Sequence, residues 1–173
     1  MSDPSPASEI QMVQQAISFA ARAHKFHTRK DGDTPYVAHP FRVFFVVRHV
    51  FGEEDPVALC AALLHDTIED TTTDYDDVLE CFGAGVADAV AALTKDMRMR
   101  EDLREPAYDA QLTQSSWQTR MVKLADVYDN FCDGKHLTSL TKIREKARRA
   151  IACAGDEKRL KAAVETLREL VRI

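Results

Sequence analysis

The sequence predicts an all-α protein, a compact multi-helix bundle formed by a single domain. Apolar residues recur at steps of three and four positions over most of the chain, the periodicity of amphipathic helices. No segment shows the sustained apolar–polar alternation that would indicate a half-buried strand. The length of 173 residues fits one domain, and a hydrophobic content of 45% supplies a buried core.

Turn and capping residues divide the chain into its expected helices. An irregular segment over 28–39, with Gly32 and Pro35 as turn signals, follows the first helix. Asp55 caps a helix that leads into residues 65–70, and Asp74 caps a short helix that ends at Gly83. Residues 95–105 are expected to form a helix end and a loop. The remaining helices are expected over about 8–27, 40–51, 84–94, 107–131 (in one piece or two), 137–153 and 156–172.

Composition argues against several classes of protein. A net charge of −5 does not suit non-specific binding to nucleic acid, which needs a basic surface. No apolar run approaches the length of about 20 residues that spans a membrane, and the N-terminus lacks the apolar core of a signal peptide. The four cysteines are scattered without a CxxC pair, as expected for reduced thiols in a cytoplasmic protein. The sequence leaves the oligomeric state open.

The segment at residues 65–70 carries the strongest chemical signal. His65 and Asp66 follow an apolar run, Glu69 lies four residues after His65, and Asp70 lies four residues after Asp66. On a continuous helix this spacing would place all four groups near one face. Ionisable groups at the end of a buried helix are costly unless a cation compensates them. The segment therefore predicts a metal site.

Two other residues are candidate ligands. His39 stands at a loop-to-helix junction before Pro40, and Asp126 lies one turn after Val122 on an otherwise core-like helix. Two imidazole nitrogens and two carboxylate oxygens suit Mn²⁺ or Fe²⁺, with Zn²⁺ and Mg²⁺ as alternatives. The individual residues also have ordinary interpretations, since His39 could cap a helix and Asp126 could pair with an arginine.

These motifs together are similar to a known family. The chain resembles the HD-domain metal-dependent phosphohydrolases, specifically the alarmone-hydrolase branch formed by the hydrolase domain of RelA/SpoT proteins and by the small alarmone hydrolases. The resemblance extends over residues of about 10–135, which would form the catalytic core. Residues 1–7 would be disordered, and 136–173 would add a C-terminal helical pair. The matching segments are residues 29–31, 34–40, 61–71, 82–83 and 122–126, with Asn130.

The resemblance implies a metal centre and its chemistry. One Mn²⁺ ion would be held by His39, His65, Asp66 and Asp126. Glu69 would position the attacking water and Asp70 would assist, because phosphoryl transfer to water needs a nearby carboxylate. The ordinary alternative for these two acids is a solvated helix end.

The resemblance also implies a substrate. Guanosine 3′,5′-bis(diphosphate), ppGpp, or its pentaphosphate relative would lose its 3′-pyrophosphate and leave GDP or GTP. Arg29, Lys30 and Asn130 would contact the nucleotide, and Arg29 and Lys30 belong to a basic stretch over residues 22–30 that suits a polyanion. A solvated loop is the ordinary alternative for Arg29 and Lys30.

One departure from the family pattern leaves the nucleotide open. Asp129 stands where the family usually carries an aromatic residue or a histidine, and Tyr128 is shifted by one place. An acid there would weakly repel a polyphosphate. Another phosphorylated nucleotide, such as NADPH through its 2′-phosphate or a nucleoside phosphate, is therefore an alternative substrate. A nucleotide-binding module without activity is the non-enzymatic alternative.

Overall fold

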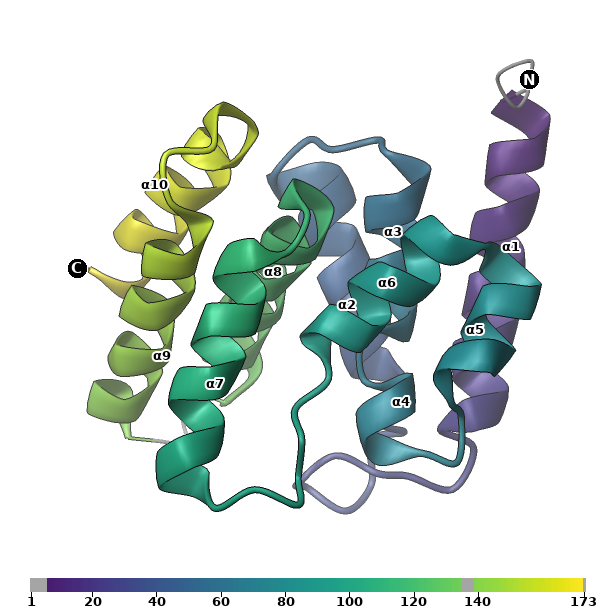
Figure 1. Ribbon diagram of the computed structural model, residues 1–173, viewed down its shortest axis with the longest axis horizontal. Helices are drawn as coiled ribbons and strands as arrows, with labels where there is room; N and C mark the ends of the chain where they lie inside the picture. Colours follow the sequence, from purple (N-terminus) through teal and green to yellow (C-terminus); the bar gives the residue numbers. More distant parts are fainter. Residues whose placement is uncertain (1–5, 135–138, 173) are drawn as a thin grey trace.

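The computed structural model describes residues 6–134 and 139–172, and these ranges form a helical bundle without a β-strand, as predicted (Figure 1). Helices α9 and α10 lie at one end of the bundle and α1 at the other. The α-helices are α1 (Pro6–Ala23), α2 (Ala38–Phe45), α3 (Pro56–Leu64), α4 (Thr67–Asp70), α5 (Tyr75–Phe82), α6 (Ala84–Leu93), α7 (Glu101–Gln114), α8 (Trp117–Gly134), α9 (Leu140–Ala154) and α10 (Lys161–Val171). A π-helical segment, η1 (Val46–Val50), continues α2, and a 3₁₀ turn, η2 (Lys158–Leu160), precedes α10.

Helix α3 is the centre of the core. The Asp55 side chain caps it by accepting a hydrogen bond from the Ala58 N–H at 3.0 Å, as the sequence predicted. Residues 58–64 are all buried, and α3 contacts α1, α2, α6 and α8. The residues that directly follow α3 are therefore delivered into the interior of the bundle.

The helix that leads into residues 65–70 does not continue through them. α3 ends at Leu64, residues 65–66 form a turn, and the short helix α4 follows. Side chains occupy the carbonyls that would continue the helix: His65 Nδ1 bonds the Ala62 oxygen at 2.9 Å, and Thr67 Oγ1 donates to the Leu64 oxygen at 2.7 Å. The break redirects the chain where the candidate ligands stand.

Other boundaries differ from the predicted ones by a few residues. α7 begins at Glu101 and α8 at Trp117, so the stretch predicted over 107–131 is two helices, the first of which includes part of the predicted 95–105 loop. The helix predicted over 8–27 ends at Ala23. Residues 1–5 and 137–138, for which we expected disorder and a helix start respectively, lie outside the described ranges. Within those ranges, no helix is both long and apolar enough to cross a bilayer.

Candidate metal centre

Four side chains from three parts of the chain bring their ligand atoms together. His39 lies in the first turn of α2, His65 and Asp66 in the turn after α3, and Asp126 in α8. His39 Nε2 lies 3.2 Å from His65 Nε2, 3.3 Å from Asp126 Oδ1 and 3.6 Å from Asp66 Oδ2. Atoms that bind one ion at about 2.1 Å lie about 3.0 to 3.4 Å apart. The spacing of His39, His65 and Asp126 therefore fits a single metal ion, and Asp66 lies slightly farther out, at the edge of this cluster.

In each imidazole, the hydrogen bond at Nδ1 determines whether Nε2 carries a lone pair or a proton. His39 Nδ1 lies 2.7 Å from Asp129 Oδ2, and His65 Nδ1 lies 2.9 Å from the Ala62 carbonyl oxygen. Both partners only accept, so both Nδ1 atoms carry the proton in the neutral rings. The two Nε2 lone pairs then face each other at 3.2 Å. Between two neutral rings this arrangement is repulsive, and either a proton on one Nε2 or a metal ion between them would relieve it.

Electrostatics also favours positive charge in this position. Burial opposes the charged form of His39, but hydrogen bonds to Asp126 and Asp129 outweigh burial and raise its pKa to about 9. Burial likewise raises the pKa of Asp66, but the neighbouring His65 outweighs it and lowers that pKa below its usual range. The site thus favours a positive charge among its carboxylates, which a divalent ion supplies.

Asp126 is held by two further residues of α8. Lys123 Nζ donates to Asp126 Oδ2 at 2.8 Å, and the Asn130 amide donates to Asp126 Oδ1. Asn130 is therefore a neighbour of the metal ligand as well as a candidate nucleotide contact. Lys123 was not singled out in the sequence, although its position three residues before Asp126 puts the two on one helix face.

The sequence suggested that Asp129 would face the substrate, but in the structure its side chain is buried. Its carboxylate is 3% exposed and accepts hydrogen bonds from His39 Nδ1 and, at 2.7 Å, from Arg42 Nε. Burial raises the pKa of Asp129, but His39 and Arg42 outweigh burial and lower it overall. The expected repulsion of a polyphosphate by Asp129 is therefore wrong, because the charge is buried behind a metal ligand and paired.

Glu69 and Asp70 line the same cavity as the ligands, of about 170 Å³. Glu69 Oε2 accepts a hydrogen bond from the Lys95 N–H at 2.7 Å. Burial and repulsion from Asp66 raise the pKa of Glu69 despite that hydrogen bond. Burial and Asp66 likewise raise the pKa of Asp70. Two carboxylates with raised pKa values beside a metal site suit proton transfer.

Tyr36 joins this group, although the sequence alone gave it no role. Its hydroxyl lies 2.7 Å from Asp66 Oδ2 and 3.0 Å from Asp70 Oδ2, so its single proton is shared between the two carboxylates. The ring of buried His24 packs against Tyr36 with a centroid distance of 4.8 Å. The position of Tyr36 three residues before His39 was the signal in the sequence that could have found it.

A second cavity, the α7–α9 cleft, adjoins the metal site and has a volume of about 240 Å³. The two cavities share Arg29 and Asn130, and Lys30 lines the cleft. Further basic residues line it from other segments: Lys95, Lys123, Lys146 and Arg149. The basic stretch at 22–30 contributes only in part, since Arg22 and Lys25 line neither cavity. Helix α9, which belongs to the predicted C-terminal helical pair, forms one wall of this cleft.

The match to known families agrees with this geometry. Residues 16–152 match the HD domain, so the chain belongs to the HD-domain family, as its motifs predicted. A divalent metal ion is consistent with this membership and with the His39, His65 and Asp126 cluster.

The names of similar proteins indicate the alarmone-hydrolase branch of the HD-domain family. A human guanosine-3′,5′-bis(diphosphate) 3′-pyrophosphohydrolase, MESH1, is 42% identical over 127 residues, which cover 73% of this chain and 71% of the human protein. A guanosine-3′,5′-bis(diphosphate) 3′-pyrophosphohydrolase of Aquifex aeolicus (strain VF5) is 33% identical over 152 residues, 86% of this chain and 20% of that protein. The solved structure of a metazoan ortholog of SpoT that hydrolyses ppGpp superposes with a TM-score of 0.77 at 25% identity, and covers 98% of this chain and 97% of that one.

Proposed function

We propose that this protein is a metal-dependent hydrolase that removes the 3′-pyrophosphate of ppGpp or its pentaphosphate relative and leaves GDP or GTP. The observation that carries the proposal is the convergence of two histidines and two aspartates in a cavity that adjoins a cleft lined by basic residues. The names of the similar human and Aquifex proteins support this substrate. The acidic net charge and scattered cysteines support a cytoplasmic enzyme that binds a small nucleotide and not nucleic acid or membrane.

We assign one Mn²⁺ ion to His39, His65, Asp66 and Asp126. The mixed nitrogen and carboxylate donors support Mn²⁺ or Fe²⁺ over ions that prefer thiolates, and Zn²⁺ and Mg²⁺ remain alternatives. When bound, the ion supplies Lewis-acid stabilisation of the charge that develops on the phosphoryl group.

Glu69 is the proposed general base. The Lys95 N–H holds Oε2, which leaves Oε1 of the same carboxylate to orient an attacking water and accept its proton. The raised pKa of Glu69, caused mainly by burial, brings its basicity closer to the working range of an enzyme. Asp70 is proposed to assist, and the Tyr36 hydroxyl keeps the Asp70 carboxylate oriented by donating to its Oδ2 at 3.0 Å.

We propose that the nucleotide binds in the α7–α9 cleft. Within the described ranges, Lys30 and Lys146 line it without a carboxylate in ion-pairing distance, whereas Arg29 is paired with Asp133 at 2.8 Å. Partial desolvation and repulsion from Lys123 lower the pKa of Lys146. A bound diphosphate would relieve this repulsion, because it brings negative charge among unpaired amines.

The test is a comparison of substrates with the purified protein. With Mn²⁺ present we expect ppGpp to be converted to GDP and pyrophosphate, both quantified by ion-exchange chromatography, and we expect EDTA to abolish the conversion. NADPH and guanosine monophosphates are assayed in parallel at the same concentration. Faster release of phosphate from NADPH than of pyrophosphate from ppGpp would contradict the proposed substrate while leaving the metal-dependent chemistry in place.

A further inference from the structure

We propose that Asp129 is a positioning residue for the metal ligand His39, and that Arg42 holds Asp129 in place. This inference rests on the proposed metal centre and is independent of which nucleotide is the substrate. Asp129 stands at the position where the sequence departs from the family pattern. The buried carboxylate is therefore a feature of this chain and not of the motif alone.

Every contact of the Asp129 carboxylate restricts its rotation. Asp129 Oδ2 accepts from His39 Nδ1 at 2.7 Å and from Arg42 Nη2 at 3.1 Å, while Oδ1 accepts from Arg42 Nε at 2.7 Å. Arg42 is itself held from the other side, since its Nη2 lies 2.8 Å from Asp133 Oδ2. Asp133 Oδ2 also accepts from Arg29 Nη2 at 2.8 Å. A continuous series of ion pairs thus runs from the cleft to His39.

The contact between Asp129 and His39 Nδ1 determines which nitrogen of His39 is free to bind a metal. With the proton held on Nδ1 by an ionised carboxylate, the Nε2 lone pair is directed at the cluster, 3.3 Å from Asp126 Oδ1. A carboxylate partner also makes the imidazole a stronger donor than a neutral partner does. The other imidazole ligand, His65, has the neutral Ala62 carbonyl at its Nδ1. The two histidines therefore differ in donor strength, and His39 depends on Asp129 for its own.

The experiment measures Mn²⁺ affinity without any substrate. Asp129→Asn keeps the shape of the side chain, but its NH₂ group must face an N–H of Arg42 or of His39. We expect the Mn²⁺ dissociation constant, measured by isothermal titration calorimetry on metal-free protein, to rise about 10- to 100-fold. Circular dichroism of the same sample checks that the variant is folded.

A paired set of variants covers the case in which Asp129→Asn does not fold because Arg42 loses its partner. Arg42→Gln keeps the carboxylate, and Arg42→Gln with Asp129→Asn replaces both partners by amides that can hydrogen-bond to each other. These two proteins differ only at residue 129. We expect the double variant to bind Mn²⁺ at least about 10-fold more weakly than Arg42→Gln.

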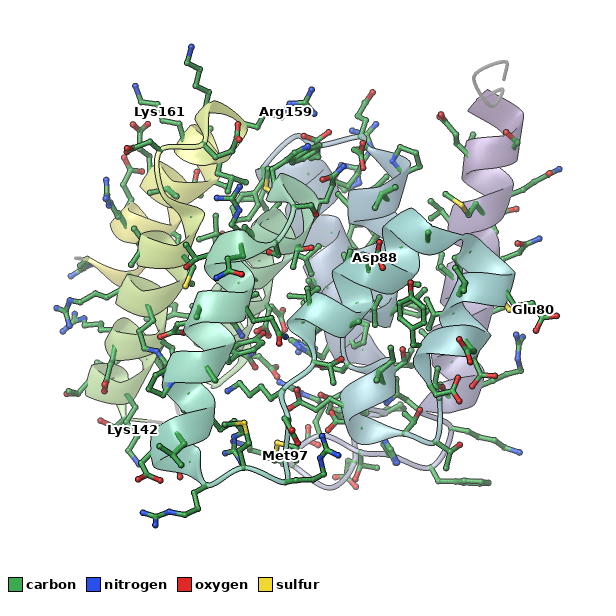
Figure 2. The ribbon with its side chains drawn as sticks, viewed as in Figure 1. Glu80, Asp88, Met97, Lys142, Arg159 and Lys161 are labelled. Atoms are coloured by element: carbon green, nitrogen blue, oxygen red, sulfur yellow. The ribbon has the colours of Figure 1, made fainter. Side chains whose placement is uncertain are left out.

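The control is Asp88→Asn on α6, a carboxylate that accepts one hydrogen bond from the Tyr75 hydroxyl at 2.8 Å on the outer surface (Figure 2). It should leave the Mn²⁺ affinity unchanged. Equal Mn²⁺ affinity in Arg42→Gln and in the double variant would overturn the role of Asp129. Failure of the wild-type protein to bind Mn²⁺ would overturn the metal centre itself, and the two failures are therefore distinguishable.

Discussion

Glu69 and the metal ligands lie within one small cavity, yet their removal should have different consequences. Glu69→Gln keeps an oxygen that can accept from the Lys95 N–H but removes the charge that takes the proton from water. We expect kcat to fall about 10²- to 10⁴-fold while the Mn²⁺ content, measured by elemental analysis after gel filtration, stays the same. Loss of the ion together with activity would show that Glu69 is a ligand.

Asp126 should behave in the opposite way. In Asp126→Asn the carboxylate is lost from the metal site, and Lys123 loses its ion-pair partner at 2.8 Å. We expect Mn²⁺ and activity to disappear together, and the free energy of unfolding to fall by about 1 to 3 kcal/mol because the partly buried charge of Lys123 is left unpaired. Thermal unfolding of metal-free samples measures the second effect alone. Retention of Mn²⁺ at wild-type affinity would remove Asp126 from the ligand set.

Arg29 tests the substrate side of the site. Its guanidinium is paired with Asp133 and lies over the Tyr36 ring, at the border of the two cavities. We expect Arg29→Ala to raise KM for ppGpp more than it lowers kcat, because a remote phosphate or base contact is made equally in ground and transition states. Arg98→Ala is the matched control, since the side chain of that arginine is 91% exposed and is paired with Asp96. An unchanged KM in Arg29→Ala would place the nucleotide elsewhere.

Motif residues and their partners differ in how far the sequence reveals them. His39, His65, Asp66 and Asp126 stand in short segments with recognisable spacing, and the structure brings them together. Asp129 looked unfavourable in the sequence because its partner Arg42 lies 87 positions away. Only the packing of α2 on α8 reveals that the two charges neutralise each other.

At the scale of elements, the loop between α6 and α7 is held in place by contacts with the neighbouring helices. Lys95, in this loop, donates its N–H to Glu69 and its Nζ to Glu105 Oε1 on α7 at 2.7 Å. Arg149 on α9 donates to Glu105 Oε2 at 2.9 Å and to Asp109 Oδ2 at 2.8 Å. Figure 2 shows Met97 of the same loop below α6 and beside the lower part of α7. Through these ion pairs, α9 holds the loop that orients Glu69.

These ion pairs predict a dependence of stability on pH. Burial raises the pKa of Glu105, but Lys95 and Arg149 outweigh burial and lower it from 4.5 to about 2. A depressed pKa in the folded state stabilises the protein above the unfolded value of 4.5, and the contribution is lost as the pH falls towards 2. We therefore expect Glu105→Gln to lower the free energy of unfolding at pH 7 and to have little effect near pH 2.

Urea unfolding of both proteins across this pH range measures the difference. Glu101→Gln, a change at an exposed carboxylate in the first turn of the same helix, is the control and should show a much smaller pH-dependent difference. A destabilisation by Glu105→Gln that is equal at pH 2 and pH 7 would contradict the ion-pair explanation.

Over the whole molecule, helical periodicity was enough to predict the class of fold, because most of the helices around the buried α3 bury one face and expose the other. Helix breaks were harder to predict. The turn at residues 65–66 depends on the hydrogen bond from Thr67 Oγ1 to the Leu64 carbonyl. The spacing of apolar residues does not predict such a side-chain hydrogen bond. The α7–α9 cleft was also missed. Its lining comes from segments as far apart as Lys30 and Lys146, which become neighbours only when α9 packs on α7 and α8.

The central claim is that one metal ion, held by two histidines and two aspartates, makes this bundle a ppGpp hydrolase. The most direct test is a stepwise titration of metal-free protein with Mn²⁺, in which bound metal and the rate of ppGpp hydrolysis are measured on the same samples. The account predicts that the rate rises in proportion to bound Mn²⁺ and reaches its maximum at one ion per chain. Hydrolysis by the metal-free protein, or a fully loaded protein that leaves ppGpp intact, would contradict it.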